Sequence, residues 1–235
     1  MANFQHGTTA RFYYHSYDMS CYAEQVEQQL NRSLAEYRPL CADSVIRVPG
    51  QYDVSLTLTG GAFTSDFDLF MFNRLTEEGA HPWVLTPGGD VHGRTAYMGE
   101  SFGQNQQRVA GDDVLRLPVS KVSTGDLYLG TILHALDAPG VSPGTSYDGG
   151  AASPDGAIAT LICTVLEDTA PTLDVTIEHS VDEVVWDTLI TFTQLTVPGS
   201  EMVEVSGAVR RYLRATWTVG GITPVTEFFV SIARL

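Results

Sequence analysis

Lysine is nearly absent from this sequence. Lys121 is the only lysine beside twelve arginines, and the 13 basic residues are outnumbered by 28 acidic ones, which gives a formal net charge of −15. A groove that grips nucleic-acid phosphates needs clustered Lys and Arg, so this balance argues against one. An acidic, soluble surface is the simplest interpretation. A more specific interpretation is that the acidic residues face a molecule to which the protein must not adhere.

Cysteine is also scarce, and long apolar runs are missing. Cys21, Cys41 and Cys163 lie far apart, with no CxxC pair and no Cys/His metal spacing, so we expect free, reduced thiols in a protein made in a cytoplasm. No window approaches the length of a membrane span. The start, Met-Ala-Asn-Phe-Gln-His, has no basic segment before an apolar run, so no signal peptide is expected.

Motifs for catalysis are missing as well. No Gly-x-Ser-x-Gly frames a serine, and neither Gly60-Gly61 nor Gly149-Gly150 leads into the Gly-Lys-Ser/Thr of a phosphate loop. No metal spacing such as His-x-x-x-His occurs among the six histidines, His6, His15, His81, His92, His134 and His179. Acidic groups could join a calcium site but lack the regular alternation of a calcium loop; they are Asp66 with Asp68, Glu77-Glu78 and Asp112-Asp113. We therefore predict no enzyme, no cofactor and no metal site.

What the sequence does contain is β-structure. Hydrophobic residues make up 43% of its 235 residues, which is enough for a real core. In the stretch 173–192, Leu173, Val175 and Ile177 alternate with polar residues, and a second arm places Trp186, Thr188, Ile190 and Phe192 on one face. A period of two predicts a strand with one buried face, and the short polar connection 180–183 predicts a hairpin.

The first half reads as further strands with one short helix. Alternation predicts strands near residues 10–15, 52–59, 95–102, 114–119 and 127–133. Ser65 is expected to cap a helix from Asp66 through Leu75, with acidic residues in its first turn. The segment 24–37 fits both a helical stripe and an alternating strand, and its Glu, Gln, Leu and Ala content slightly favours the helix.

A change of composition divides the chain. Residues 138–156 are rich in Gly, Pro, Ser, Ala and Asp and lose all periodicity, which indicates a linker or a long exposed loop. After it, regularly spaced strands predict a small Ig-like or jelly-roll-like β-sandwich over 157–235. The prediction is a mainly β protein: a sandwich or barrel domain over 1–137 with one short helix, the linker, and a small C-terminal sandwich.

Residues 4–137 resemble the major tail tube proteins of long-tailed (siphovirus-type) bacteriophages. Four motifs carry the likeness: Phe4-Gln5-His6-Gly7, Asp18-Met19-Ser20-Cys21-Tyr22, the turn and strand from Pro49 to Gly60, and Leu127 to Leu133. The resemblance implies an extended strand over 23–37, although this chain is rich in Gln and Glu there. It also implies a virion structural protein, assembled in the host cytoplasm, whose copies form stacked, hexameric rings around a DNA-conducting channel.

The resemblance implies particular partners: further copies of the chain, other phage tail proteins, and DNA that passes through the lumen without specific binding. No membrane partner is expected. Residues 157–235 are similar to β-sandwich modules of phage virion proteins, which leaves a capsid decoration or carbohydrate-binding virion protein as the alternative. Trp186 and Trp217 could bind sugars, but the alternation favours core packing for both. Tyrosines in the N-terminal region could contact neighbouring subunits, namely Tyr13, Tyr17, Tyr22 and Tyr37.

Overall fold

The computed structural model describes residues 9–37, 45–59, 64–109, 118–123, 125–136 and 141–235. Over these residues the protein is mainly antiparallel β-structure, as predicted. The chain groups into two compact units: unit 1 holds residues 1–21, 81–100 and 127–235, and unit 2 holds 22–80 and 101–126. The chain passes between the two units four times, and one of these passages, between Glu100 and Ser101, lies within the strand β6 (Thr95–Gln106). The division into domains at 138–156 stays a prediction.

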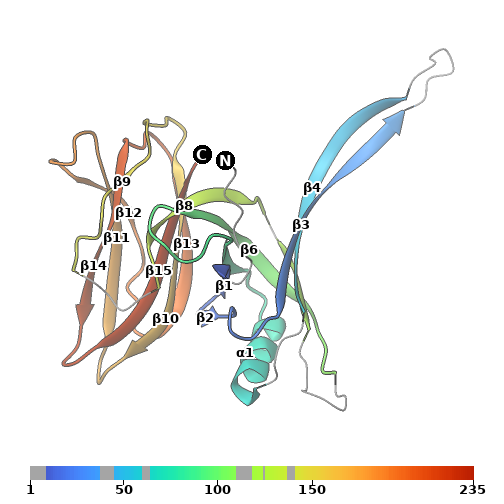
Figure 1. The fold of residues 1–235 in the computed structure, drawn as a ribbon, viewed down its shortest axis with the longest axis horizontal. Coiled ribbons are helices and arrows are strands. Elements are labelled where there is room, and N and C mark those ends of the chain that lie inside the picture. Colours follow the sequence, from blue (N-terminus) through green and yellow to red (C-terminus); the bar gives the residue numbers. More distant parts are fainter. Residues whose placement is uncertain (1–8, 38–44, 60–63, 110–117, 124, 137–140) are drawn as a thin grey trace. The chain divides into compact units, whose positions relative to one another are not determined.

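Unit 1 contains a β-sandwich (Figure 1). Its larger sheet has the order β13-β10-β15-β8-β6-β5-β1-β2, with bounds β13 Gly199–Val205, β10 Ala157–Glu167, β15 Val225–Arg234, β8 Tyr128–His134, β6 Thr95–Gln106, β5 His81–Thr86, β1 Arg11–Tyr14 and β2 Tyr17–Asp18. Its smaller sheet has the order β12-β11-β14-β9, with bounds β12 Asp187–Thr191, β11 Thr172–Ser180, β14 Tyr212–Gly220 and β9 Tyr147–Asp148. β9 lies within the predicted linker, so part of that stretch pairs with the small sheet.

The central strands of the larger sheet are buried on both faces. On one face, Leu161 of β10 and Phe228 of β15 belong to a core shared with Val175 and Trp217 of the small sheet. On the other face, Ile162 and Phe229 belong to a second core, which also contains Tyr13, Val84 and Met98. This double burial explains why β10 reads as a nearly continuous apolar run, a pattern expected of strands covered on both sides.

The predicted hairpin 173–192 forms as β11 and β12, but its second arm differs from the prediction. Leu173, Val175, Ile177, Ile190 and Phe192 are buried as expected. A bulge then shifts the register, so that Ile190 pairs with Ile177 whereas Thr188 pairs with Glu178. A shift of one residue moves the remaining side chains to the other face. Thr188 is therefore exposed and Trp186 is only half-buried, which corrects their predicted place in the core.

Unit 2 is built from β3 (Gln25–Tyr37), β4 (Ile46–Thr59), β7 (Val119–Ser123), the second half of β6, and the helix α1 (Ser65–Thr76). The segment 25–37 is a strand, as the resemblance implied, and not the helix that local composition favoured. It pairs with β4 along its whole length, and these inter-strand hydrogen bonds override a weak helical preference.

The helix forms where it was expected, with a different cap. Thr64, not Ser65, is the N-cap, and its Oγ1 accepts the backbone N–H of Phe67 at 3.2 Å. Asp66 and Asp68 lie in the first turn, where the helix dipole favours negative charge. The predicted strand 114–119 lies largely outside the described residues, and β7 begins at Val119.

Candidate assembly surface

The register of unit 2 sorts the side chains of four strands onto two faces. β3 pairs with β4, β4 with β7, and β7 with β6. Residues directly opposite one another in antiparallel strands point to the same side, and successive residues alternate. The covered face consists of Val26 and Gln28 on β3, Val54, Leu56 and Leu58 on β4, Val119 and Lys121 on β7, and Gly103 and Gln106 on β6.

The helix α1 packs on the covered face. Phe67 and Met71 are its buried residues. A Cβ on Gly103 would lie 3.1 Å from Leu75 Cδ1, so the glycine lets the helix approach the sheet closely. Gln106 donates from Nε2 to the Asp68 carboxylate at 2.8 Å. The apolar residues of the sheet thus meet the apolar stripe of the helix, and Asp68 is fixed at its rim.

The opposite side, the open face, is polar and acidic. Its side chains are exposed or half-buried, and they are Gln25, Glu27, Gln29 and Asn31 on β3, Asp53, Ser55, Thr57 and Thr59 on β4, Ser120 and Val122 on β7, and Phe102 and Asn105 on β6. Two carboxylates are among these side chains, those of Glu27 and Asp53. None of the twelve is basic.

The lone lysine lies on the covered face. Lys121 is fully buried, and its pKa is lowered well below the usual 10.5, chiefly by desolvation and secondly by the charge of Arg74. The one strand position of β7 that carries a cation therefore points away from the open face. Alternation alone separates the buried lysine side chain from the exposed polar surface.

The ends of β3 and β4 extend past the region that α1 covers, as a two-stranded ribbon (Figure 1). We call residues 30–37 and 46–53 the distal arm. From residue 30 to 36 every side chain is exposed. Leu30 and Leu34 are each 57% exposed and continue the apolar side of β3 beyond the helix, with Arg32 between them. An isolated two-stranded ribbon is marginal in water, so this apolar stripe is a surface that needs a partner.

A bulge shapes the distal arm. The register shifts between Arg32, which pairs with Tyr52, and Leu34, which pairs with Pro49. Arg32 Nε donates to Gly50 O at 3.0 Å, and Ser33 Oγ donates to Gln51 O at 3.1 Å. The Ser33 hydroxyl occupies the space where a side chain at position 50 would lie, which explains the glycine there. Near the tip, Arg47 pairs with Glu36 at 2.9 Å.

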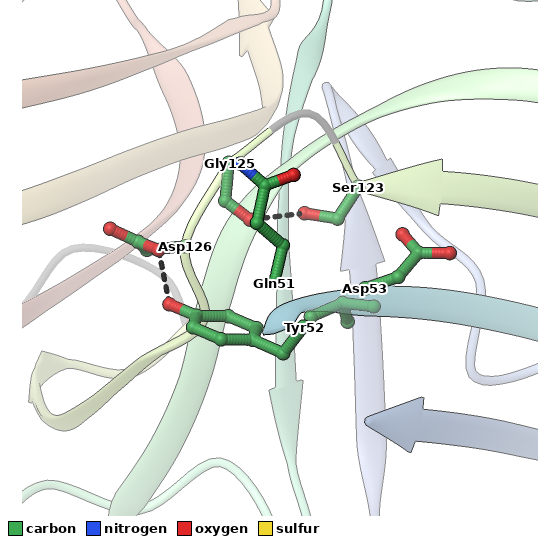
Figure 2. Close-up of a pocket in the computed structure, with 7 residues that line it drawn as sticks. Gln51, Tyr52, Asp53, Ser123, Gly125 and Asp126 are labelled. Carbon is green, nitrogen blue, oxygen red and sulfur yellow. Dashed lines mark hydrogen bonds between the residues drawn. The ribbon is translucent and has the colours of Figure 1, made fainter. Parts of the chain in front are cut away.

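A polar cleft of about 270 Å³ lies where the distal arm leaves the sheet. Figure 2 shows the Tyr52 hydroxyl directed at Asp126 and the Ser123 hydroxyl directed at Gly125. The Ser123 contact is 3.4 Å long. Asp53 also lines the cleft. Its two carboxylates have no His or Cys beside them, so the cleft offers polar contact and no evident chemistry.

The residues that the sequence offered for chemistry do not come together. Asp68 binds Arg108 through an ion pair of 2.7 Å, and Glu77 pairs with Arg74 at 2.5 Å, whereas Asp112 and Asp113 lie outside the described residues. Within the described ranges, no group of three or more His, Cys, Asp and Glu could hold a metal ion. No described helix is both long and apolar enough to cross a membrane.

The aromatic residues considered for sugar binding or subunit contact have different surroundings. Trp217 is 8% exposed and belongs to the sandwich core, as predicted. One face of Trp186 is covered by the Arg214 guanidinium, 4.0 Å from the ring centroid, and Arg214 is held by Glu178 at 2.7 Å. Tyr13 is 1% exposed and packs on Phe229, so it is a core residue and not an interface residue.

The open face and the distal arm were missed by the sequence reasoning. The alternation in β3 and β4 was visible, but their pairing with β7 and β6 was not. Only that pairing identifies which polar residues share a face.

Comparison with known proteins finds several solved structures that resemble this chain distantly, including the following two. One is a chain from the virion of a native gene transfer agent particle, at 12% identity and a TM-score of 0.43, over 54% of this chain and 98% of that one. The other is the Dit protein of phage SPP1, described as a hub adsorption apparatus in phages that infect Gram-positive hosts, at 12% identity and a TM-score of 0.40, over 96% and 99%. No protein-family model matches, and no curated protein matches. At this similarity the likenesses carry no argument about function.

Proposed function

We propose that this protein is a virion structural protein, a phage tail subunit whose copies assemble into rings and stack into the tail tube. The observation that carries the proposal is that unit 2 combines an open polar face with a distal arm on which Leu30 and Leu34 are exposed among the described residues. A closed assembly of copies gives the arm a partner and leaves the open face in water.

The arm suits a head-to-tail interface. Its β3 edge pairs only with β4 in the described part of the chain, so one row of backbone groups is available to a neighbour. An interface between two different surfaces closes into a ring when its rotation closes. Six copies per ring is what the resemblance to tail tube proteins implies.

The open face suits the lining of a channel through which DNA moves. Glu27 and Asp53 supply negative charge, and no cation on this face can bind phosphates. Like charge on the wall and on the DNA prevents adhesion, so DNA slides through without specific binding. Negative charge on the outer surface of a tube would not act on DNA inside the channel.

Assembly is tested by electron microscopy of the purified protein after negative staining. Wild-type protein should form evenly striated tubes with a central channel. Leu30→Glu should abolish tubes while leaving a folded chain, because it places a charge in the apolar stripe. Asn31→Glu adds the same charge one position along but on the open face, and should still form tubes.

The outcomes separate the alternatives. Tubes from both variants, or from neither, would refute the assignment of the two faces. Single rings that never stack would make the chain a ring component outside the tube. A protein that remains monomeric or trimeric under all conditions would overturn the proposal.

The lumen assignment has its own test. Asn31→Lys and Asn31→Gln tubes should differ in retention of short double-stranded DNA, with binding by the lysine variant that weakens as salt rises. Equal, negligible binding by both would place position 31 outside the channel.

The alternative of a carbohydrate-binding virion protein has less support. Such a function needs an exposed aromatic platform in residues 157–235. Trp217 is a core residue there, and Arg214 covers one face of Trp186.

A further inference from the structure

His179 lies at the end of β11, in unit 1, and is nearly buried. Its side chain is on the same face as Ile177, opposite Leu213 of β14, and the residue is 9% exposed. The backbone N–H of Arg210 donates to His179 Nδ1 over 3.3 Å. A backbone N–H can only donate, so Nδ1 carries no proton and the ring is neutral, with its hydrogen on Nε2.

This hydrogen bond fastens a connecting segment, residues 206–211, which we call loop 206–211. Several other contacts also fasten the loop, among them the Gly149 N–H, which donates to Arg211 O at 3.0 Å, and the Arg234 guanidinium, which donates to Val209 O at 3.4 Å. Val209 exchanges two backbone hydrogen bonds with Ser153, of 2.8 and 2.9 Å. The Arg234 guanidinium donates to Arg210 O at 2.7 Å and to Arg211 O at 2.8 Å. Two ion pairs also hold the loop, Arg210 with Asp187 and Arg211 with Asp148, and His179 is the imidazole among the groups that fasten it.

The charges around His179 oppose a second cation. Arg210 lies on the loop, Arg234 on β15, and Asp187 on β12 pairs with the Arg210 guanidinium. Burial lowers the pKa of His179 first, Arg210 and Arg234 lower it further, and Asp187 alone raises it.

Other charged residues near His179 form ion pairs with one another. Glu178 points to the opposite side of β11 and binds Arg214. Arg211 is paired with Asp148 at 2.6 Å.

We propose that His179 is an acid-sensitive latch on loop 206–211. When Nδ1 takes up a proton from the solvent, it changes from an acceptor into a donor that faces the Arg210 N–H. The hydrogen bond is lost, and a positive charge appears near the guanidiniums of Arg210 and Arg234. The Arg210 N–H then separates from β11, while the other bonds of the loop and the core of the sandwich remain.

The direction of the pH dependence follows from the lowered pKa. In the unfolded chain the imidazole titrates near 6.5, and in the folded chain it titrates below that value. The unfolded state therefore binds more protons between the two values, so stability falls as the pH drops from 6.5 to the folded pKa. Above 6.5 the latch is closed and contributes fully.

Amide hydrogen exchange tests the latch directly. Protection factors of the Arg210 amide are measured at about pH 7.5 and about pH 5, on either side of the histidine range. We expect protection in the wild type to fall by roughly fivefold to tenfold at the lower pH, the loss of one backbone hydrogen bond. The amides of Val175 and Ile177, in the sandwich core, should keep their protection.

Three variants make the test specific. His179→Asn places an amide oxygen where Nδ1 lies and does not titrate, so protection should be high at both pH values. His179→Leu should show low protection at both. His92→Asn removes a different histidine of unit 1 and should behave as the wild type.

A wild type whose protection is equal at both pH values would overturn the proposal. So would an equal loss in His179→Asn, because that variant has no group to protonate at this position.

Discussion

Gly130 of β8 is a position where a single methyl group should destabilise unit 1. A Cβ built there would meet the carbonyl oxygen of Ile232 on β15 first, and it would lie 2.6 Å from Met98 Cε and 2.8 Å from the Ile232 carbonyl carbon. The end of the methionine side chain can move aside. The Ile232 backbone cannot, because its strand pairs with β8 on one edge and β10 on the other.

The cost can be worked from these distances. Carbon atoms in unstrained contact lie about 3.5 Å or more apart, so β8 and β15 would have to separate by about 0.7 Å near the new methyl group. A ladder hydrogen bond of ordinary length, about 2.9 Å, would then reach about 3.6 Å and be lost. One lost bond costs about 1 kcal/mol, and overpacking costs about 1–3 kcal/mol. We expect Gly130→Ala to lower the free energy of unfolding by about 2–4 kcal/mol.

Urea unfolding followed by tryptophan fluorescence is a suitable assay, because Trp83, Trp186 and Trp217 all lie in unit 1. Leu129→Ala is the matched control: Leu129 is the preceding residue of the same strand but is 62% exposed, so we expect a change within about 0.5 kcal/mol. An unfolding midpoint for Gly130→Ala equal to that of the wild type would refute the reasoning, since it would show that β8 and β15 separate at no cost.

Three further predictions concern single interactions. Thr64→Ala should lower the stability of unit 2 by about 1 kcal/mol in urea unfolding monitored by circular dichroism, and Thr64→Ser, which keeps the capping hydroxyl, should restore most of it. Arg234→Met should cost unit 1 about 3 kcal/mol by fluorescence, since the guanidinium donates to four backbone carbonyls; an unchanged midpoint would show that water replaces it. The pKa of Asp182 is held below its ordinary 3.8 by the N–H groups of Val185 and Val184. The stability that the ionised carboxylate contributes is therefore present above pH 3.8 and is lost as the pH falls further. Asp182→Asn should flatten the curve of unfolding free energy against pH below about pH 4, and an unaltered curve would contradict this.

Local pattern was sufficient to predict much of the fold. Strands with one buried face, such as β4 and β14, were evident from alternation, because burial imposes a period of two on the side chains. The helix was evident from its acidic first turn, although the cap was placed one residue late. Residues 25–37 show the limit of local information. Their composition favours a helix, but pairing with β4 makes them a strand.

Long-range register accounts for what could not be predicted. The second arm of the β11–β12 hairpin alternates cleanly in sequence, yet one bulge moves Trp186 and Thr188 to the other side. The open face has the same origin. Ser120 shares it with Thr57 and Asn105 only because β4, β7 and β6 are adjacent. The sequence of a single strand does not show which strands pair with it.

The double burial of β10 and β15 has a consequence for how this chain can be divided by engineering or by recombination. A fragment of residues 157–235 would keep the strands β11, β12 and β14 of the small sheet but lose β9. It would also present Ile158, Ile162 and Phe229 to water in place of the core that they share with Tyr13 and Val84. Such a fragment should be prone to aggregate when expressed alone.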